Sequence, residues 1–294
     1  SLDQEGGLVD RLRRVVTPMP AASDFKNTES VRQFARIIAE TLRIIGFNMN
    51  FAPVVDVVDE SRSGFNNGLR SRAFGNSTEQ AAEFAGVFLE EMQSNGCLGC
   101  IKHYPGLGAA EVDSHEELPL VNISDEEFLA ADLSPYRSLI ANGTAHAVMA
   151  AHATYPQVGL QETGQDGRLL PSSLSRAMIT DLLRDELRFD SVVITDDLEM
   201  GAIVRNYGIG EACKMAINAG VDMLAICAGT DNIRDGFKAI SDSVRAGEIS
   251  EKRIDESVRR VLELKSKILT PLPFDASRLD QLSLEITELK NSLK

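Results

Sequence analysis

The chain has 294 residues, of which 43% are hydrophobic and 25% charged, and its formal net charge at neutral pH is −14. This length and composition suit one large α/β domain or two smaller ones and allow a sizeable hydrophobic core. The acidic charge argues against a nucleic-acid or anionic-lipid partner, and no apolar run approaches the roughly 18 residues of a membrane span.

Strand-like and helical patterns alternate along the chain. The sequence predicts buried strands over residues 48–57, 97–103, 145–156, 191–200 and 221–229. It predicts helices over residues 28–47, 77–96, 124–143, 172–189, 208–220, 230–247 and 250–269. Thr28 and Ser77 are the predicted N-caps of the first two helices, and Pro135 predicts a break in the third. The long loop 59–77 is rich in Gly, Asn, Ser and Arg, and such loops are often functional.

This alternation predicts a parallel sheet covered by helices, as either a (β/α)₈ barrel or an open doubly wound sheet. No strand leads into a G-x-G-x-x-G turn, so a dinucleotide site has no support. Polar residues collect where the predicted strands end: Asp56, Lys102, His103, His152, Asp196 and Asp197. Because strand ends share one mouth in a barrel, where active sites lie, we predict an α/β fold of the TIM-type (β/α)₈ barrel. The five predicted strands fall short of eight.

The cysteine pattern leaves two interpretations. Cys97 and Cys100 form C-x-x-C, which can indicate redox or metal chemistry. They lie in the strand-like run GCLGCIKHY, which favours small buried apolar groups instead. A four-cysteine zinc site would need a second closely spaced pair.

Asp196 is the first candidate for chemistry. The run VVITDDLEM leads a hydrophobic strand directly into two carboxylates, and burying a carboxylate without a partner is costly. We expect Asp196 to be functional and Asp197 to be its structural partner. The alternative is that one of them caps the following helix.

Two further pairs follow the strand that ends near residue 103. Lys102 and His103 would share the barrel mouth with Asp196, although a lysine at a strand end can also be a surface residue with a packed stem. Asp113 and His115 lie two residues apart on the next loop, where a carboxylate can orient an imidazole that exchanges a proton near neutral pH. The alternative for EVDSHEELP is a solvated acidic loop.

Two other interpretations concern the same residues. His103, Asp113, His115 and His152 could in principle be zinc ligands, but their spacing matches no specific metal motif. The turn PGLG alone is a weak sign of phosphate binding.

Seven segments together resemble the glycoside hydrolase family 3 β-N-acetylhexosaminidases, of the bacterial β-N-acetylglucosaminidase type that acts in cell-wall recycling. In chain order they are DQEGGLVDRL, NFAPVVDV, RAF, KHYPGLG, DSHEELP, MAAHATYP and ITDDLEM. The resemblance covers nearly the whole chain. It implies a catalytic barrel over residues 1–270 and a peripheral C-terminal tail over residues 271–294.

The resemblance also implies roles for individual residues. Asp196 matches the nucleophile, which forms a covalent glycosyl-enzyme. His115 matches an unusual acid/base, with Asp113 as its partner, in place of the second carboxylate of most retaining glycosidases. The residues implied to hold the sugar are Asp3, Arg11, Arg72, Lys102, His103, His152 and Met200. No cofactor or metal is implied.

The chain departs from the family pattern at two places. Leu107 stands where the family usually has the second His of P-G-H-G, which removes a polar group from that turn. The chain also begins at SLDQEGG, a segment that closes the third strand in the family. We therefore expect the barrel to lack its first two to three strands. Open edges and an uncovered core would make the isolated chain unstable or inactive unless those strands are supplied.

The sequence thus predicts a retaining exo-β-N-acetylglucosaminidase that acts on GlcNAc-containing oligosaccharides or muropeptides. One alternative is a β-GlcNAc phosphorylase on the same fold, because a neutral His does not repel phosphate as a carboxylate would. The others are a metal-dependent hydrolase and an inactive carbohydrate-binding remnant. The cysteines favour a cytoplasmic location, whereas a missing N-terminus with a signal would allow secretion or a lipoprotein. No oligomeric state is predicted.

Overall fold

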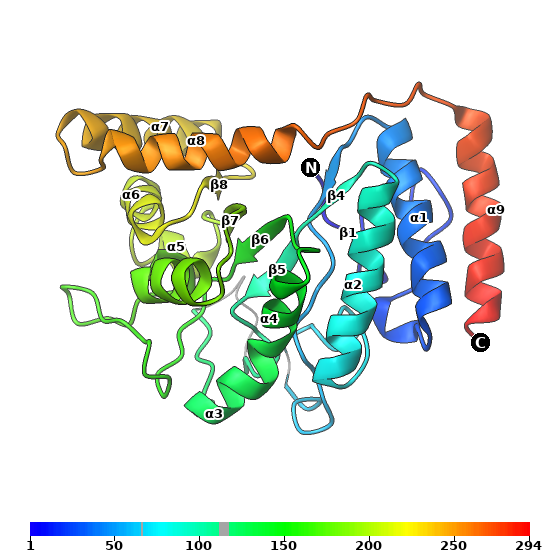
Figure 1. The fold of residues 1–294 in the computed structure, drawn as a ribbon, viewed down its shortest axis with the longest axis horizontal. Coiled ribbons are helices and arrows are strands. Elements are labelled where there is room, and N and C mark those ends of the chain that lie inside the picture. Colours follow the sequence, from blue (N-terminus) through cyan, green and yellow to red (C-terminus); the bar gives the residue numbers. More distant parts are fainter. Residues whose placement is uncertain (66, 112–117) are drawn as a thin grey trace.

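A parallel β-sheet runs through the computed structural model, and helices pack along its outside (Figure 1). The structure describes residues 1–65, 67–111 and 118–294. The main sheet has the order β5-β6-β7-β8, and its neighbouring strands are parallel. These strands are β5 (Ile101–Tyr104), β6 (Ala147–Ala150), β7 (Val192–Asp197) and β8 (Met223–Ala225).

Shorter pairings extend this sheet toward the N-terminus. β3 (Met49–Asn50) pairs in parallel with β4 (Leu98–Gly99), and a parallel bridge joins Val54 to Lys102. Leu2 forms a further parallel bridge with Asn50, next to the antiparallel hairpin of β1 (Gln4–Gly6) and β2 (Val9–Asp10). Within the described ranges β8 pairs only with β7, so no closed barrel is formed. The parallel α/β fold is confirmed, and closure into a barrel stays a prediction.

Most of the helices lie where the hydrophobic pattern predicts them, but α5 and α9 fall outside the predicted ranges. The α-helices are α1 (Thr28–Ile44), α2 (Thr78–Ser94), α3 (Asp125–Glu127), α4 (Ser134–Ala141), α5 (Gly201–Val204), α6 (Ile209–Ala219), α7 (Thr230–Arg245), α8 (Glu251–Lys265) and α9 (Ala276–Ser292). The 3₁₀ segments are η1 (Ala22–Asp24) and η3 (Ser172–Leu174), and the π-helical ones are η2 (Phe128–Asp132) and η4 (Ala177–Glu186).

Of the predicted helix caps and breaks, two are confirmed and one is wrong, and the helix predicted over 172–189 consists of the separate segments η3 and η4. Ser77 caps α2 as predicted, because its side chain accepts the Gln80 N–H. Pro135 lies in the first turn of α4, just after η2 ends, so it does mark a break. The prediction of Thr28 as N-cap is wrong by one residue. Asn27 caps α1 instead, since its side-chain oxygen accepts the Ser30 N–H.

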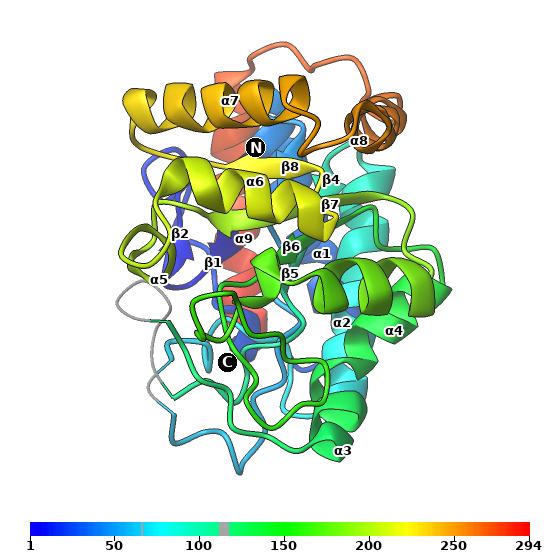
Figure 2. The ribbon, with the colours of Figure 1, turned by 90° about the vertical axis from the view of Figure 1, so that its left-hand side faces the viewer.

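Two hydrophobic clusters hold the helices to the sheet. The larger fills the space between the main sheet and helices α2, α4 and α6, and α6 packs in turn against α7 (Figure 2). The second joins α1 and α2 to α9, which lies beside α1 within the 271–294 tail. The apolar stripe of α9 that packs there consists of Leu279, Leu282, Ile286 and Leu289.

The structure describes all four cysteines as free, and three of them are buried. Burial raises the pKa of Cys97 to about 12 and also raises that of Cys100, so neither thiol is ionised near neutral pH. The interpretation of C-x-x-C as buried apolar groups is confirmed. No helix in the described part of the chain is long and apolar enough to cross a lipid bilayer.

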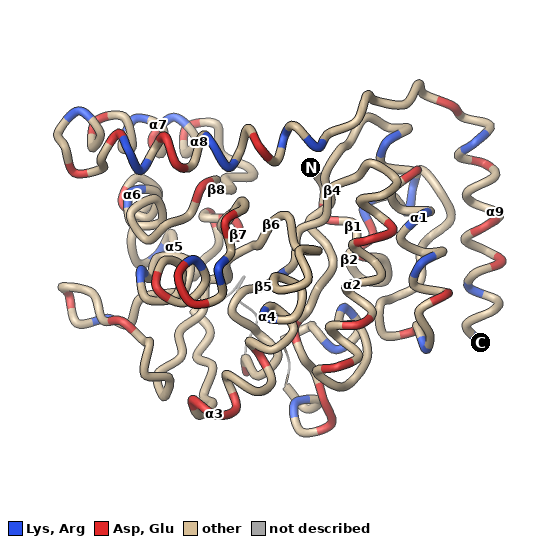
Figure 3. The backbone as a smooth tube through the Cα atoms, in the orientation of Figure 1, with Lys and Arg blue, Asp and Glu red and all other residues tan. Residues whose placement is uncertain are grey.

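A buried carboxylate fastens α8 to the start of the sheet. Asp222, just before β8, accepts the backbone N–H of Val193 at 3.0 Å and contacts Arg184 at 2.5 Å. Its Oδ1 also accepts hydrogen bonds from three side chains of α8: Arg253 at 3.2 Å, Ser257 at 2.8 Å and Arg260 at 3.2 Å. Outside this cluster, charges of both signs alternate along the exposed faces of α7 and α8 (Figure 3).

We expect Asp222→Ala to lower the free energy of unfolding by about 3–5 kcal/mol, because it leaves buried guanidinium groups without their carboxylate. The matched control is Asp190→Ala. Asp190 pairs with Arg259 and Arg260 of the same helix but is exposed, so its loss should cost at most about 1 kcal/mol. Urea denaturation followed by circular dichroism measures both values, and equal values would contradict the expectation.

Candidate active site

A buried ammonium group lies at the centre of the site. Lys102, on β5, is only 2% exposed, and its Nζ lies 2.6 Å from Asp3 Oδ1 and 2.6 Å from Glu5 Oε1. Burial acts to lower the pKa of Lys102, but Glu5 and Asp3 outweigh it and the pKa is raised. Lys102 is therefore charged at neutral pH, and its position depends on these carboxylates.

Glu5 shares its carboxylate between two cations. Arg72 binds it through two contacts, Nε to Oε2 at 2.7 Å and Nη2 to Oε1 at 2.9 Å. Burial acts to raise the pKa of Glu5, but Lys102 and Arg72 lower it to about 2. Sequence reasoning missed Glu5. Its signal was the spacing from Asp3, since residues two apart on an extended backbone point to the same side.

His103 is held between Asp56 and Arg72. Its Nδ1 lies 2.7 Å from Asp56 Oδ2, and its Nε2 lies 3.3 Å from Arg72 Nη2. A guanidinium group only donates, so in this contact Nε2 accepts and Nδ1 carries the proton toward Asp56. The contacts therefore set the tautomer of His103. We call Asp3, Glu5, Asp56, Arg72, Lys102 and His103 the Lys102 cluster.

The PGLG turn is held by contacts to its backbone. Asp56 Oδ1 accepts the Leu107 N–H at 2.6 Å, and the Asn67 side chain donates to carbonyls of residues 107, 108 and 110. A Cβ atom at Gly108 would lie 1.9 Å from the Val57 carbonyl oxygen, so this position requires glycine. The Leu107 side chain is buried in the main core. Contacts to Asp56, Asn67 and Val57 therefore hold this turn, and the side chain at position 107 packs in the core.

Asp196 lies at the end of β7, beside the Lys102 cluster. Its Oδ1 accepts the Asp197 N–H at 2.8 Å. Burial acts to raise the pKa of Asp196, but the polar groups around it, among them this N–H and Lys102, outweigh burial and the pKa is lowered. The next helix, α5, has no side-chain cap, so Asp196 does not serve as one. An ionised carboxylate beside a polar cluster suits a nucleophile.

His152 contacts the backbone at the end of β7. Its Nε2 lies 3.1 Å from the carbonyl oxygen of Asp197, and its Nδ1 lies 2.7 Å from Ser173 Oγ. A carbonyl only accepts, so Nε2 carries the proton and Nδ1 accepts from the serine hydroxyl. Burial lowers the pKa of His152, which favours this neutral form. Met200 is also buried here, and its N–H donates to the Asp197 carbonyl at 3.0 Å.

The structure brings most of the sequence-predicted residues together. Asp3, Arg72, Lys102 and His103 form one network, and their charges and that of Asp196 act on one another. Arg11 is exposed, and no hydrogen bond or ion pair joins its side chain to a described residue. The predicted dyad of Asp113 and His115, with Ser114 between them, lies outside the described residues.

The zinc alternative gains no support from the described ranges. In them no group of three His, Cys, Asp or Glu side chains could hold a metal ion. His103 and His152 are occupied by the protein contacts given above, while Asp113 and His115 fall outside the description.

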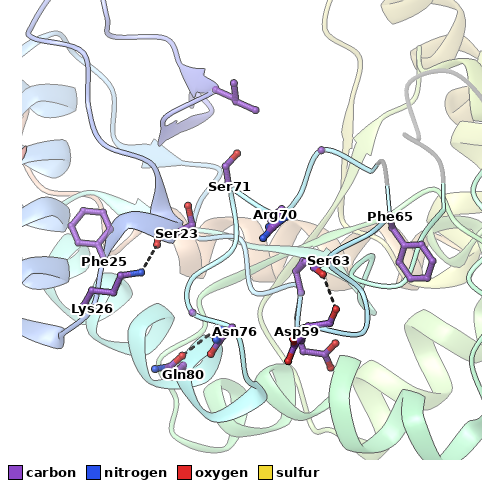
Figure 4. A pocket seen from close by; sticks show the side chains of 15 residues that line it. Ser23, Phe25, Lys26, Asp59, Ser63, Phe65, Arg70, Ser71, Asn76 and Gln80 are labelled. Carbon is purple, nitrogen blue, oxygen red and sulfur yellow. Dashed lines mark hydrogen bonds between the residues drawn. The ribbon is translucent and has the colours of Figure 1, made fainter. Parts of the chain in front are cut away.

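A pocket of about 730 Å³ opens next to two segments that supply the cluster (Figure 4). It contains Leu8 from the turn that follows Glu5, and Arg70 and Ser71 from the loop that carries Arg72. The other lining residues are Ser23, Phe25, Lys26, Val58, Asp59, Glu60, Ser63, Phe65, Gly68, Gly75, Asn76 and Gln80. No residue of the Lys102 cluster lines it, so this pocket and the cluster are separate features.

We expect Glu5→Gln to lower the free energy of unfolding at pH 7 by about 3 kcal/mol, from the difference between an ordinary carboxyl pKa and about 2. A folded-state pKa below the ordinary value gives stability that is complete above about 4.5 and is lost as pH falls toward 2. The gap between the two proteins should therefore shrink from pH 5 to pH 3 in urea titrations. The exposed Glu251→Gln serves as control, and a gap independent of pH would contradict the expectation.

The chain matches the family model described as the Glycosyl hydrolase family 3 N terminal domain over residues 1–264. A protein from Psychromonas ingrahamii named beta-hexosaminidase is 32% identical over 280 residues, which cover 92% of this chain and 77% of that relative.

Solved structures agree with this match. A glycoside hydrolase family 3 β-N-acetylglucosaminidase from Paenibacillus sp. str. FPU-7 superimposes with a TM-score of 0.84 at 35% identity, over 98% of this chain and 55% of that one. A chain described as the beta-glucoside phosphorylase BglX superimposes with a TM-score of 0.82 at 25% identity, over 98% and 51%. The chain thus spans about half the length of these solved proteins. From residue 1 to residue 264 the chain belongs to glycosyl hydrolase family 3, as a member of its N-terminal domain family.

Proposed function

We propose that this chain carries the active site of a retaining exo-β-N-acetylglucosaminidase, which releases terminal β-linked GlcNAc. The main supporting observation is the ionised carboxylate of Asp196 beside Lys102 and His103. The family assignment, and the hexosaminidase and glucosaminidase names of similar proteins, support the sugar class.

In the proposed first step, an oxygen of Asp196 attacks the anomeric carbon and forms an ester. The bond to the leaving oxygen breaks, and that oxygen takes a proton from His115. In the second step His115 accepts a proton from water, whose oxygen attacks the same carbon and frees Asp196. Two displacements give the β-product. The roles of His115 and its partner Asp113 rest on the family resemblance.

The Lys102 cluster supplies the proposed sugar contacts. Lys102 and Arg72 donate charge-assisted hydrogen bonds to hydroxyl or acetamido groups, and Asp3 accepts from hydroxyls. Asp3 suits this role because its side chain is 38% exposed although it contacts Lys102. We propose that Arg11, His103, His152 and Met200 complete the sugar site, and that substrates include muropeptides. This mechanism uses no cofactor.

We expect Asp196→Ala to lower kcat/KM for an aryl β-GlcNAc by at least about 10³-fold, because the covalent step loses its nucleophile. Azide, an external nucleophile, should restore part of the turnover and give the α-glycosyl azide. Absorbance of the released phenol and NMR of the azide product measure the two effects.

Asp190→Ala is the matched control, since Asp190 precedes the same strand at its opposite end and is exposed. Its turnover should equal that of the unchanged chain. Unchanged turnover in Asp196→Ala, or a β-azide product, would contradict the assignment of Asp196.

Phosphorolysis is the second candidate, favoured by the similarity to a chain described as a phosphorylase. If the chain is a hydrolase, phosphate should leave the rate unchanged and the product should be free GlcNAc. Rates with and without added phosphate, followed by ³¹P NMR of the products, separate the two reactions. Phosphate-dependent turnover with GlcNAc-1-phosphate as product would establish the phosphorylase instead.

A further inference from the structure

Glu199 joins two loops at the mouth of the site. It follows β7 by two residues, and its carboxylate reaches across to the segment 227–229 that connects β8 to α7. Oε2 accepts the Ala228 N–H at 2.5 Å and Oε1 accepts the Gly229 N–H at 2.8 Å. The Asn232 side chain donates to Oε1 at 2.6 Å. One carboxylate therefore holds the start of α7 against the segment that carries Asp196.

The residues around Glu199 accommodate its carboxylate and stabilise its negative charge. A Cβ atom at Gly229 would come within 2.7 Å of both Glu199 Oε1 and Asn232 Nδ2, so a side chain there would displace the contact. The N–H of Ala228, the Asn232 side chain and the N–H of Gly229 lower the pKa of Glu199. A negative charge also stabilises the N-terminus of the 16-residue helix α7.

The held segment 227–229 includes Cys227. Cys227 is exposed, whereas the other three cysteines are buried. Partial desolvation and the carboxylates of Asp197, Asp3 and Asp196 together raise the pKa of Cys227 to about 11. Ala225, two residues before Cys227, pairs with Asp197 in the sheet, so Cys227 lies next to the end of β7 that carries Asp196.

We infer that Glu199 is a positioning residue for the reaction at Asp196: it holds segment 227–229 so that Cys227 forms one wall of the sugar site. This inference rests on the proposed function. Removing the carboxylate frees Ala228 and Gly229, the wall moves away from Asp197, and the sugar loses a surface that aligns it with Asp196.

Cys227 itself reports on the position of the segment. We expect Glu199→Ala to speed the reaction of Cys227 with a disulfide reagent such as DTNB by about tenfold at pH 8, because the thiol leaves the carboxylates that suppress its ionisation. The pH midpoint of labelling should fall from about 11 toward the ordinary thiol value. In the same variant kcat/KM for an aryl β-GlcNAc should fall by about 10- to 100-fold.

Two controls make the result specific. Glu251→Ala removes an exposed glutamate from the first turn of α8 and should change neither the labelling nor the turnover. Cys227→Ser should abolish the fast labelling and so identify the labelled residue. Glu199→Gln keeps one acceptor oxygen and should fall between the unchanged chain and Glu199→Ala.

Labelling of Glu199→Ala that matches the unchanged chain would overturn the inference, as would faster labelling with unchanged kcat/KM. Absence of turnover in the unchanged chain would contradict the proposed function alone. The labelling midpoint would then still decide whether Glu199 holds segment 227–229.

Discussion

The buried charge of Lys102 constrains the rest of the site. An ammonium group out of water needs carboxylates, and Glu5 and Asp3 supply them. Glu5 in turn binds Arg72 with both oxygens. Arg72 presents only donors to His103, so His103 must accept at Nε2 and donate from Nδ1 to Asp56. One buried charge thus fixes side chains from several separate segments, and the tautomer of an imidazole beside Asp196 follows from it.

A second buried ionic cluster, around Asp222, shows how a structural cluster differs from a functional one. Asp222 lies where β7 and β8 begin, and arginines from two helical segments surround its carboxylate completely. The Lys102 cluster lies where β5 ends, and Asp3 keeps more than a third of its side chain exposed. Parallel α/β folds commonly place stability at the first end and chemistry at the second. A buried ionic cluster therefore stabilises the fold where β7 and β8 begin, whereas the cluster at the end of β5 leaves acceptor oxygens of Asp3 open to a ligand.

The parts of the structure that the sequence predicts well depend on periodicity and strand direction. Apolar patterns placed the strands and helices, and parallel strands ending at one edge explain why Lys102, His103 and Asp196 meet. Glu5 and Glu199 were missed because their partners come from loops distant in sequence, whose paths periodicity does not describe. The sequence also could not predict that the Leu107 side chain packs in the core, because this depends on which way one side chain points from a turn. Barrel closure and the Asp113–His115 dyad remain predictions.

Two potential nucleophiles lie close together at this mouth, and electrostatics distinguishes them. Different neighbouring groups act on Cys227 and on Asp196, and they shift the two pKa values in opposite directions. Burial and three carboxylates raise the pKa of the thiol to about 11, so it stays protonated and weakly nucleophilic near neutral pH. The pKa of Asp196 is lowered in spite of burial, and the Asp197 N–H and Lys102 are among the causes, so Asp196 is ionised. An ammonium group and a donated N–H near Asp196, and carboxylates near Cys227, favour attack by the carboxylate. This selection supports a glycosyl ester on Asp196 over a thioglycoside on Cys227.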